Sequence, residues 1–143
     1  GSAMVRPARP ADLDAAAAIW LEGNLSAHDF IPPQYWQGNV ELVKGLLAQA
    51  ELYVYEDEGE VLGFLGLEDG YIAGIFVRSE ARSRGTGRQL LEAAKGLYSR
   101  LTLRVYQKNR RAADFYRREG FSVREESVDE GTGEAEYWME WEA

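Results

Sequence analysis

The chain has 143 residues, of which 45% are hydrophobic, and its formal net charge at pH 7 is −8. This length and composition predict one folded domain with a single core, and no apolar run approaches the ~20 residues that a membrane-spanning helix needs. The lack of cysteine excludes disulfides and thiolate chemistry, the single histidine argues against a histidine-rich metal site, and the acidic balance argues against a nucleic-acid partner.

We therefore expect no metal, no nucleic-acid partner and no membrane partner, and a reducing, cytoplasmic setting fits this composition. Gly1, Ser2 and Ala3 stand before Met4 and are typical of an expression-tag remnant, so one domain is expected over residues 4–142. Residues 125–143 hold eight acidic and no basic side chains, which places the excess negative charge at the C-terminal end.

The first part of the domain is predicted to contain one strand and two helices. A short strand is expected at 4–8, and apolar residues at helical spacing predict a helix over 13–23, with Gly23 as its stop. The segment 28–36 contains two adjacent prolines and suits a loop or the first turn of a helix. A second helix is expected over 41–50.

The hydrophobic period then changes to that of strands. Alternating β-branched and aromatic residues, separated by tight turns, predict three consecutive antiparallel strands at 51–56, 60–68 and 70–77. Gly63, Gly66 and Gly74 fall inside these strands, where a glycine marks a bulge or a place at which another group approaches the backbone.

The last part of the chain alternates helices and strands. We expect a helix at 88–100, a strand at 101–107, a helix that stops at Gly120, and two closing strands at 121–127 and 134–142. The full order of elements is typical of a mixed α/β layer arrangement.

The segment from Arg82 to Arg88 reads Arg-Ser-Arg-Gly-Thr-Gly-Arg and joins a strand to a helix. A helix start offers unpaired N–H groups and the positive end of the helix dipole, and the arginines add cationic donors. The loop is therefore a candidate cradle for a pyrophosphate, although by itself it also fits an ordinary glycine-rich turn.

A second pattern lies on the next helix. Asn109 and Tyr116 are seven residues apart, nearly two helical turns, so they share one face with Ala112 and Ala113 between them. The same face also suits the buried stripe of an amphipathic helix.

Together the two patterns resemble the GNAT superfamily of acyl-CoA-dependent N-acyltransferases. The first family motif, Arg/Gln-x-x-Gly-x-Gly/Ala, is matched by residues 82–87, and the second, Asn-x-x-Ala-x-x-x-Tyr-x-x-x-Gly-Phe, by residues 109–121. The stretch His28-Asp29-Phe30 after the first helix is similar to that of small stand-alone bacterial members. The resemblance covers residues 4–142 and implies a mixed, mostly antiparallel sheet of about seven strands flanked by about four helices.

The resemblance also implies the roles of individual residues, with acetyl-CoA as the co-substrate and no metal. Tyr116 matches the phenol that protonates the departing thiolate, a role that suits the collapse of a tetrahedral intermediate. The residues that match the cofactor-binding positions are Ile75, Phe76 and Val77 on the strand, Arg82, Ser83, Arg84, Gly85, Thr86, Gly87 and Arg88 in the loop, and Asn109.

The base that deprotonates the amine is open between Glu68 at a strand end and His28, with Asp69 and an ordered water chain as alternatives. A histidine titrates near neutral pH, yet a lone histidine is also commonly a satisfied structural group.

The resemblance implies that the acceptor is a small-molecule or peptide amine. Candidate walls of its pocket are Phe30, Tyr35, Trp36 and Trp138. If the glutamates of the C-terminal end face this pocket, they favour a cationic amine such as a polyamine, an aminoglycoside or a basic peptide end.

Three further questions stay open at this point. A non-catalytic CoA-binding or protein-interaction module on the same fold is the alternative to an enzyme, because a fold does not determine a function. The acyl group and the oligomeric state, monomer or homodimer, are also undetermined, since the last strand suits either the sheet interior or an edge that pairs with a second copy.

Overall fold

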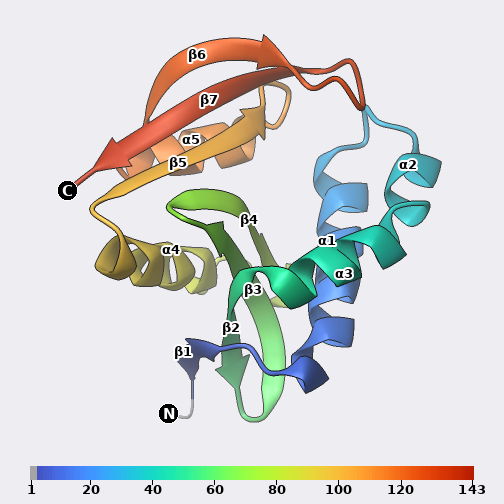
Figure 1. Cartoon of the computed structure of the whole chain (residues 1–143), viewed down its shortest axis with the longest axis vertical. Helices are drawn as coiled ribbons and strands as arrows, with labels where there is room; N and C mark the ends of the chain where they lie inside the picture. Colours follow the sequence, from blue (N-terminus) through green and yellow to red (C-terminus); the bar gives the residue numbers. More distant parts are fainter. Residues whose placement is uncertain (1–2) are drawn as a thin grey trace.

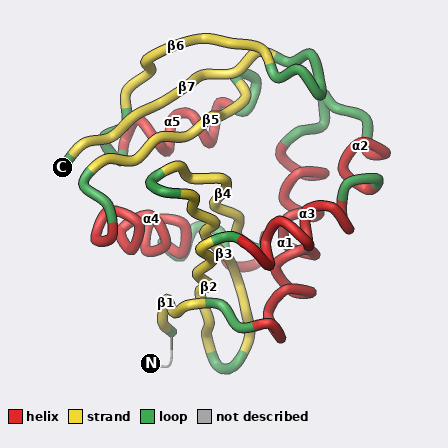
Figure 2. The backbone as a smooth tube through the Cα atoms, viewed as in Figure 1, coloured by secondary structure: helices red, strands yellow, loops and turns green. Residues whose placement is uncertain are grey.

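The computed structural model describes residues 3–143, in which one open, twisted sheet carries helices on both faces (Figure 1; Figure 2). Within this range the sheet has seven strands in the order β1-β2-β3-β4-β5-β7-β6. The strands are β1 Met4–Pro7, β2 Glu51–Asp57, β3 Glu60–Glu68, β4 Tyr71–Val77, β5 Arg100–Tyr106, β6 Ser122–Val128 and β7 Ala135–Glu142. Gly1 and Ser2 of the expected tag remnant lie outside the described residues.

Five α-helices accompany the sheet in the described part of the chain. They are α1 Leu13–Ala27, α2 Pro33–Gln37, α3 Val40–Gln49, α4 Thr86–Leu97 and α5 Arg110–Arg118, with short 3-10 turns at Pro10–Asp12 and Ser79–Ala81. The expected mixed α/β class, with a mostly antiparallel sheet, is confirmed. None of the helices in residues 3–143 combines the length and the apolar character that a membrane-spanning helix needs.

Both faces of the sheet are covered by apolar side chains from the helices. On one face α1 and α3 pack against Val54 and Phe64, and on the other α4 and α5 pack against Leu65, Leu67 and Leu103. These five strand residues are at most 2% exposed. The alternation of Phe64 with Leu65 along β3 explains how one strand supplies both cores.

Glycines shape the strands at the expected places. The β2–β3 and β3–β4 turns place Glu58-Gly59 and Asp69-Gly70 at positive φ, the backbone that two-residue hairpins require. The register shifts beside Gly66, where β3 faces β4, as expected for a bulge.

Two predicted helix ends are wrong. Gly23 does not stop α1, which continues to Ala27. The glycine instead lets the helix pack closely against β4, since a Cβ at Gly23 would lie 2.8 Å from the Phe76 ring. The helix after the loop ends at Leu97, since Tyr98 is already extended. The segment with the two prolines forms the short helix α2, which begins at Pro33 as a helix first turn permits.

The sheet opens between its two central strands. β4 and β5 are parallel, but they pair only at Tyr71 with Thr102 and at Ile72 with Leu103, and then diverge (Figure 1). Each strand leads into a helix, α4 after β4 and α5 after β5, so both helix N-termini lie at this opening.

Candidate active site

A cavity of about 790 Å³ lies where β4 and β5 diverge. Its wall combines the end of α1, the C-terminal half of β4, the loop before α4 and the inward face of α5. Every predicted cofactor-binding residue except Arg84 lines this cavity, and so do Tyr116 and His28. The guanidinium of Arg84 instead donates a hydrogen bond of 2.8 Å to the Glu80 carbonyl.

The loop before α4 forms one part of the cavity wall. Ser83 and Gly85 have φ of 70° and 76°, which turns the chain sharply into the helix. Gly85 is the N-cap of α4, and glycine has no side chain that could accept a hydrogen bond. The N–H groups in the first turn of this 12-residue helix are therefore not capped by the N-cap side chain. Such a helix start suits the oxygens of a phosphate.

The charge of the cavity wall is opposite to that of the whole molecule. Its charged lining residues are five arginines and one lysine and include no carboxylate: Arg82, Arg88, Arg110, Arg111, Arg118 and Lys108. Sequence reasoning identified Arg82 and Arg88 but missed the other four. The pair Arg110-Arg111 directly after Asn109 was the available signal, since it begins a helix beside the expected site. In a chain of net charge −8, this local reversal suits an anionic ligand.

Tyr116 lies on the face of α5 that borders the cavity. Its ring packs between those of Phe115 and Phe121, with centroids 5.2 and 5.5 Å away, and the residue is 8% exposed. Burial, and secondarily the charge of Tyr71, raises the pKa of the Tyr116 phenol well above its ordinary value. The phenol therefore stays protonated at neutral pH and is available as a proton donor.

Asn109 begins α5 and His28 ends α1, and the two side chains meet. Asn109 is the N-cap of α5, where its side-chain oxygen accepts from the Ala112 N–H. Its amide nitrogen lies 3.0 Å from His28 Nε2, and His28 Nδ1 lies 2.8 Å from Asn24 Oδ1. Burial lowers the pKa of His28 to about 4.

The four predicted acceptor residues fall into two groups of contacts, and their role in acceptor binding stays a prediction. Phe30, Tyr35 and Trp36 belong to an aromatic group around His28 and Tyr106, with ring centroids 4.9 to 5.7 Å apart. Trp138 lies on β7, where the Arg104 guanidinium stacks on its ring at 4.6 Å. All four lie outside the lining of the 790 Å³ cavity.

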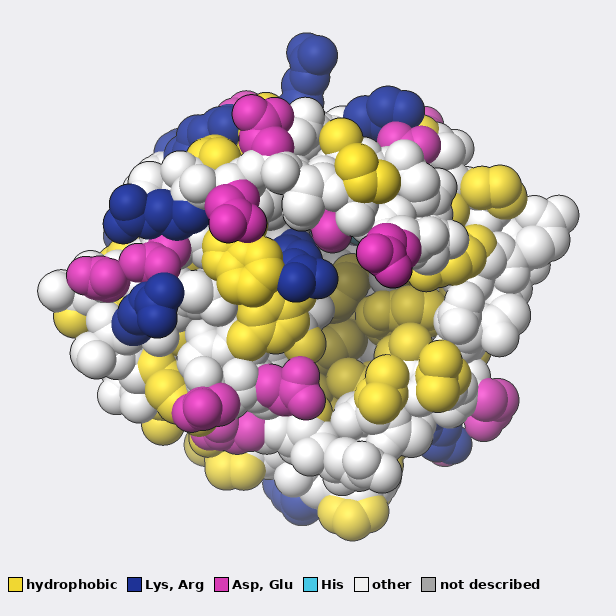
Figure 3. All heavy atoms as spheres, turned by 45° about the horizontal axis from the view of Figure 1, so that its top comes forward, with side chains coloured by type: hydrophobic (Ala, Val, Ile, Leu, Met, Phe, Trp, Pro, Cys, Tyr) yellow, Lys and Arg dark blue, Asp and Glu magenta, His cyan; other side chains and the backbone are white. Residues whose placement is uncertain are grey.

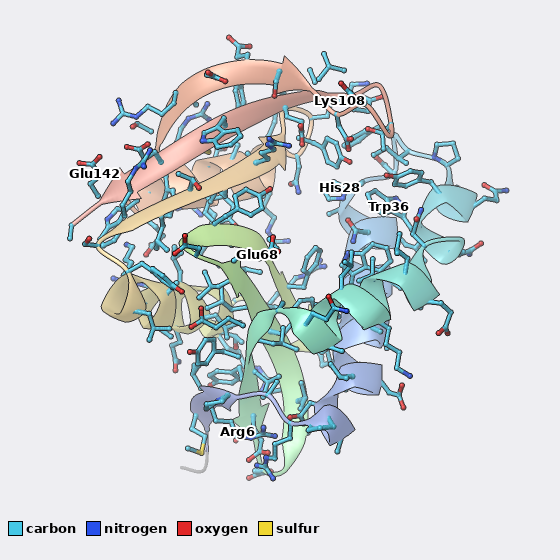
Figure 4. The ribbon with its side chains drawn as sticks, in the orientation of Figure 1. Arg6, His28, Trp36, Glu68, Lys108 and Glu142 are labelled. Carbon is cyan, nitrogen blue, oxygen red and sulfur yellow. The ribbon has the colours of Figure 1, made fainter. Side chains whose placement is uncertain are left out.

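Glu68, the other candidate base, is exposed at the end of β3, in register with Tyr71 and also outside that lining (Figure 4). Burial raises the pKa of the Tyr71 phenol, the positive charge of Arg104 lowers it, and the negative charges of Glu136, Glu68 and Asp129 raise it. The phenol therefore has charges of both signs nearby. Sequence reasoning missed Tyr71 and Tyr106, because the parallel pairing of β4 with β5 that relates them joins segments far apart in the sequence.

The comparisons with known proteins agree with this geometry. The sequence model of the acetyltransferase (GNAT) domain family matches residues 48–123. The peptidyl-lysine N-acetyltransferase YiaC of Escherichia coli K12 is 34% identical over 140 residues, which cover 96% of each chain. The peptidyl-lysine N-acetyltransferase YjaB of the same strain is 31% identical over 120 residues, or 83% of this chain and 82% of that protein.

Solved structures extend the similarity to the fold. The apo form of Escherichia coli YjaB has a TM-score of 0.88 and 29% identity, with 97% of both chains covered. The PaiA N-acetyltransferase of Thermoplasma acidophilum, solved with coenzyme A, covers all of both chains with a TM-score of 0.82 and shares the fold at 16% identity. On the family match, the two relatives above 30% identity and the shared fold, the chain belongs to the GNAT superfamily and is an N-acetyltransferase.

Proposed function

We propose that the enzyme transfers the acetyl group of acetyl-CoA to the side-chain amine of a lysine in a peptide or protein, with Tyr116 as the general acid. The observation that carries this proposal is the single cavity that Tyr116 shares with all but one of the predicted cofactor-binding residues. A co-substrate held there lies against the proton donor that its chemistry requires.

The residues of the cavity suit the parts of acetyl-CoA. The N–H groups at the start of α4, with Arg82 and Arg88, suit the pyrophosphate. Beyond Ile72, the backbone of β4 has no partner on the β5 side, so Ile75 and Val77 suit the amides of the pantetheine arm in a strand-like pairing.

The chemistry follows from these positions. The lysine amine attacks the thioester carbonyl, a carbon–nitrogen bond forms and the carbon–sulfur bond breaks. The Tyr116 hydroxyl gives its proton to the departing sulfur, and the proton that the new amide nitrogen loses restores the hydroxyl, so that the products are the acetylated lysine and the free thiol of CoA. Backbone N–H groups near Val77 are candidates to polarise the thioester oxygen.

The acceptor side supports a cationic substrate. Glu136, Glu68 and Asp129 lie close enough to Tyr71 to raise the pKa of its phenol, and Figure 3 shows acidic side chains, together with a basic one, at the rim of a hollow lined by hydrophobic side chains. An ammonium group on a flexible lysine chain suits this acidic rim. Both Escherichia coli relatives are named peptidyl-lysine N-acetyltransferases, which favours a peptide over a free small molecule. Glu68 stays the proposed base, since it is exposed at the end of β3, beside Tyr71 on the proposed acceptor side.

Peptide acetylation followed by mass spectrometry tests the substrate class. The acceptor is a peptide with a blocked N-terminus and one internal lysine, and the matched control has arginine at that position. We expect acetyl-CoA to acetylate the lysine and leave the arginine peptide unchanged. Acetylation of free polyamines or of unblocked N-termini, with no lysine product, would contradict the proposed acceptor.

A further inference from the structure

A continuous chain of hydrogen bonds connects α1 to α5 beside the cavity. Asn24 Nδ2 donates to the Trp20 carbonyl at 2.9 Å, and Asn24 Oδ1 lies 2.8 Å from His28 Nδ1. His28 Nε2 lies 3.0 Å from Asn109 Nδ2, and Asn109 Oδ1 accepts from the Ala112 N–H at 3.2 Å. The two helices are thus linked by side chains that are 81 residues apart in sequence.

Backbone groups at both ends determine the direction of every bond in this chain. The Trp20 carbonyl only accepts, so the amide nitrogen of Asn24 faces it and the oxygen faces His28. The Ala112 N–H only donates, so the oxygen of Asn109 faces it and the amide nitrogen faces His28. His28 therefore donates from Nδ1 and accepts at Nε2, which is the neutral imidazole with its proton on Nδ1.

We propose that His28 is a positioning residue whose neutral Nδ1–H ring holds the Asn109 amide in the orientation that caps α5, and that it is not the base of the reaction. The base role requires Nε2 or Nδ1 to be free to take a proton, and both nitrogens are occupied. A proton on Nε2 would set two donors against each other, His28 Nε2–H and the Asn109 amide. That amide would have to turn, and the cap on α5 would be lost.

The surroundings of His28 support the neutral ring. The residue is 9% exposed and packs against the rings of Phe30, Trp36 and Tyr106 at centroid distances of 5.6, 5.6 and 4.9 Å. No carboxylate among the described residues hydrogen-bonds to the ring, whose two partners are Asn24 and Asn109. A positive charge there would be desolvated without a counterion.

The consequence of this link reaches the proposed chemistry. Asn109 sets the first turn of α5, where Arg110 and Arg111 line the cavity, and the same helix carries Tyr116. His28 thereby couples the end of α1 to α5, the helix that holds the proposed acid. The kinetic effect of this coupling rests on the proposed acetyl transfer, whereas the protonation state of the ring does not.

Nitrogen-15 NMR of the imidazole tests the protonation state directly. His28 is the only histidine in the chain, so a sample without a histidine tag gives one set of ring signals. We expect a protonated Nδ1 and an unprotonated Nε2 at pH 7. Asn109→Asp keeps an oxygen for the Ala112 N–H but turns an acceptor toward Nε2, so the His28 pKa should rise in this variant. A wild-type ring with its proton on Nε2, or an Asn109→Asp variant with an unchanged titration, would overturn the proposal.

Paired substitutions at His28 separate positioning from base catalysis. Glutamine cannot titrate in this range, but its side-chain oxygen can accept from Asn109, whereas alanine cannot. We expect His28→Ala to lower kcat about tenfold and His28→Gln to recover most of that loss, on the scale of one hydrogen bond. Equal losses in the two variants, with a folded His28→Gln protein, would overturn the proposal. If no acetyl transfer is found at all, the NMR result still decides the tautomer.

Discussion

At the scale of single residues, the account depends on a buried phenol that keeps its proton. Tyr116 borders the cavity and is enclosed by Phe115 and Phe121, so its raised pKa follows from its burial. Its position was predictable, because the seven-residue spacing from Asn109 places both residues on one helical face. The contact between Asn109 and His28 was not, since no local spacing relates residues that lie 81 positions apart.

Tyr116→Phe removes the proton donor and keeps the aromatic ring. We expect kcat to fall by about a hundredfold or more, because the thiolate leaves without a proton, while the Kd for acetyl-CoA changes by less than about twofold. Steady-state kinetics and calorimetry measure the two quantities. The matched control is Tyr53→Phe, which removes a hydroxyl bound to Glu51 away from the cavity and should leave kcat unchanged. An undiminished kcat in Tyr116→Phe would remove the residue from the acid role.

The ion pairs of Arg6 predict how stability depends on pH. Arg6 donates to Asp12 at 2.8 and 3.1 Å and to Glu56 at 2.8 Å, and the Asp12 side chain is 10% exposed. The hydrogen bonds from Arg6 lower the pKa of Asp12 in the folded state. The unfolded state then binds more protons in acid, so this stabilisation is complete near neutral pH and is lost as the pH falls below the ordinary carboxyl value.

Asp12→Asn should therefore lower the free energy of unfolding at pH 7 by about 2 kcal/mol and make its decline between about pH 5 and pH 2 shallower. Urea unfolding at a series of pH values measures both effects. Asp114→Asn is the control, since the carboxylate of Asp114 is 60% exposed in its pair with Arg117, and it should change stability little. An equally steep acid decline in Asp12→Asn would contradict this account.

At the scale of elements, local sequence patterns predicted most helices and strands. They did not predict the places where tertiary packing overrides the local helix propensity of a residue. The hairpins β2–β3 and β3–β4 were predictable from their turn residues, and the bulge beside Gly66 from glycine in a strand. The course of α1 past Gly23 was not, because it depends on Phe76, which is distant in sequence and reaches the helix only in the folded sheet.

Two glycine-to-alanine substitutions in helices test this difference. Gly23→Ala places a Cβ 2.8 Å from the Phe76 ring, so we expect a loss of about 1–3 kcal/mol in the free energy of unfolding. Gly45→Ala is the matched control in α3, where no atom lies within 4 Å of the added Cβ, and should stabilise the protein by up to about 1 kcal/mol. Thermal or denaturant unfolding compares the two variants. Equal changes would show that Gly23 has no packing role.

At the scale of the whole molecule, the charge is divided between two sides of the opening. The lining of the cavity is cationic, whereas the surroundings of Tyr71, on the proposed acceptor side, combine three carboxylates, Glu136, Glu68 and Asp129, with the guanidinium of Arg104. The sequence allowed the first half of this division to be predicted from the loop at residues 82–88. The acidic side was expected only on the condition that the C-terminal glutamates face the pocket, and the sequence could not test this condition, because the position of β7 between β5 and β6 is what brings Glu136 beside Tyr106.

This division predicts a salt-dependent preference among acceptors. The value of kcat/KM for a lysine peptide with basic neighbours should exceed that for the same peptide with acidic neighbours, and the difference should shrink as ionic strength rises. Glu136→Gln should reduce the preference without changing the Kd for acetyl-CoA. Peptides that react equally well at low salt would argue against an acidic acceptor side.

The most direct test of the central claim is to follow CoA release and peptide acetylation in one reaction. The chain contains no cysteine, so every thiol that forms in the mixture comes from CoA. With acetyl-CoA and the blocked lysine peptide, the account predicts one thiol for each acetyl-lysine detected by mass spectrometry, and both at least about a hundredfold slower in Tyr116→Phe. Acetyl-CoA that binds but yields neither thiol nor acetyl-lysine, or a Tyr116→Phe variant that turns over at the wild-type rate, would contradict it.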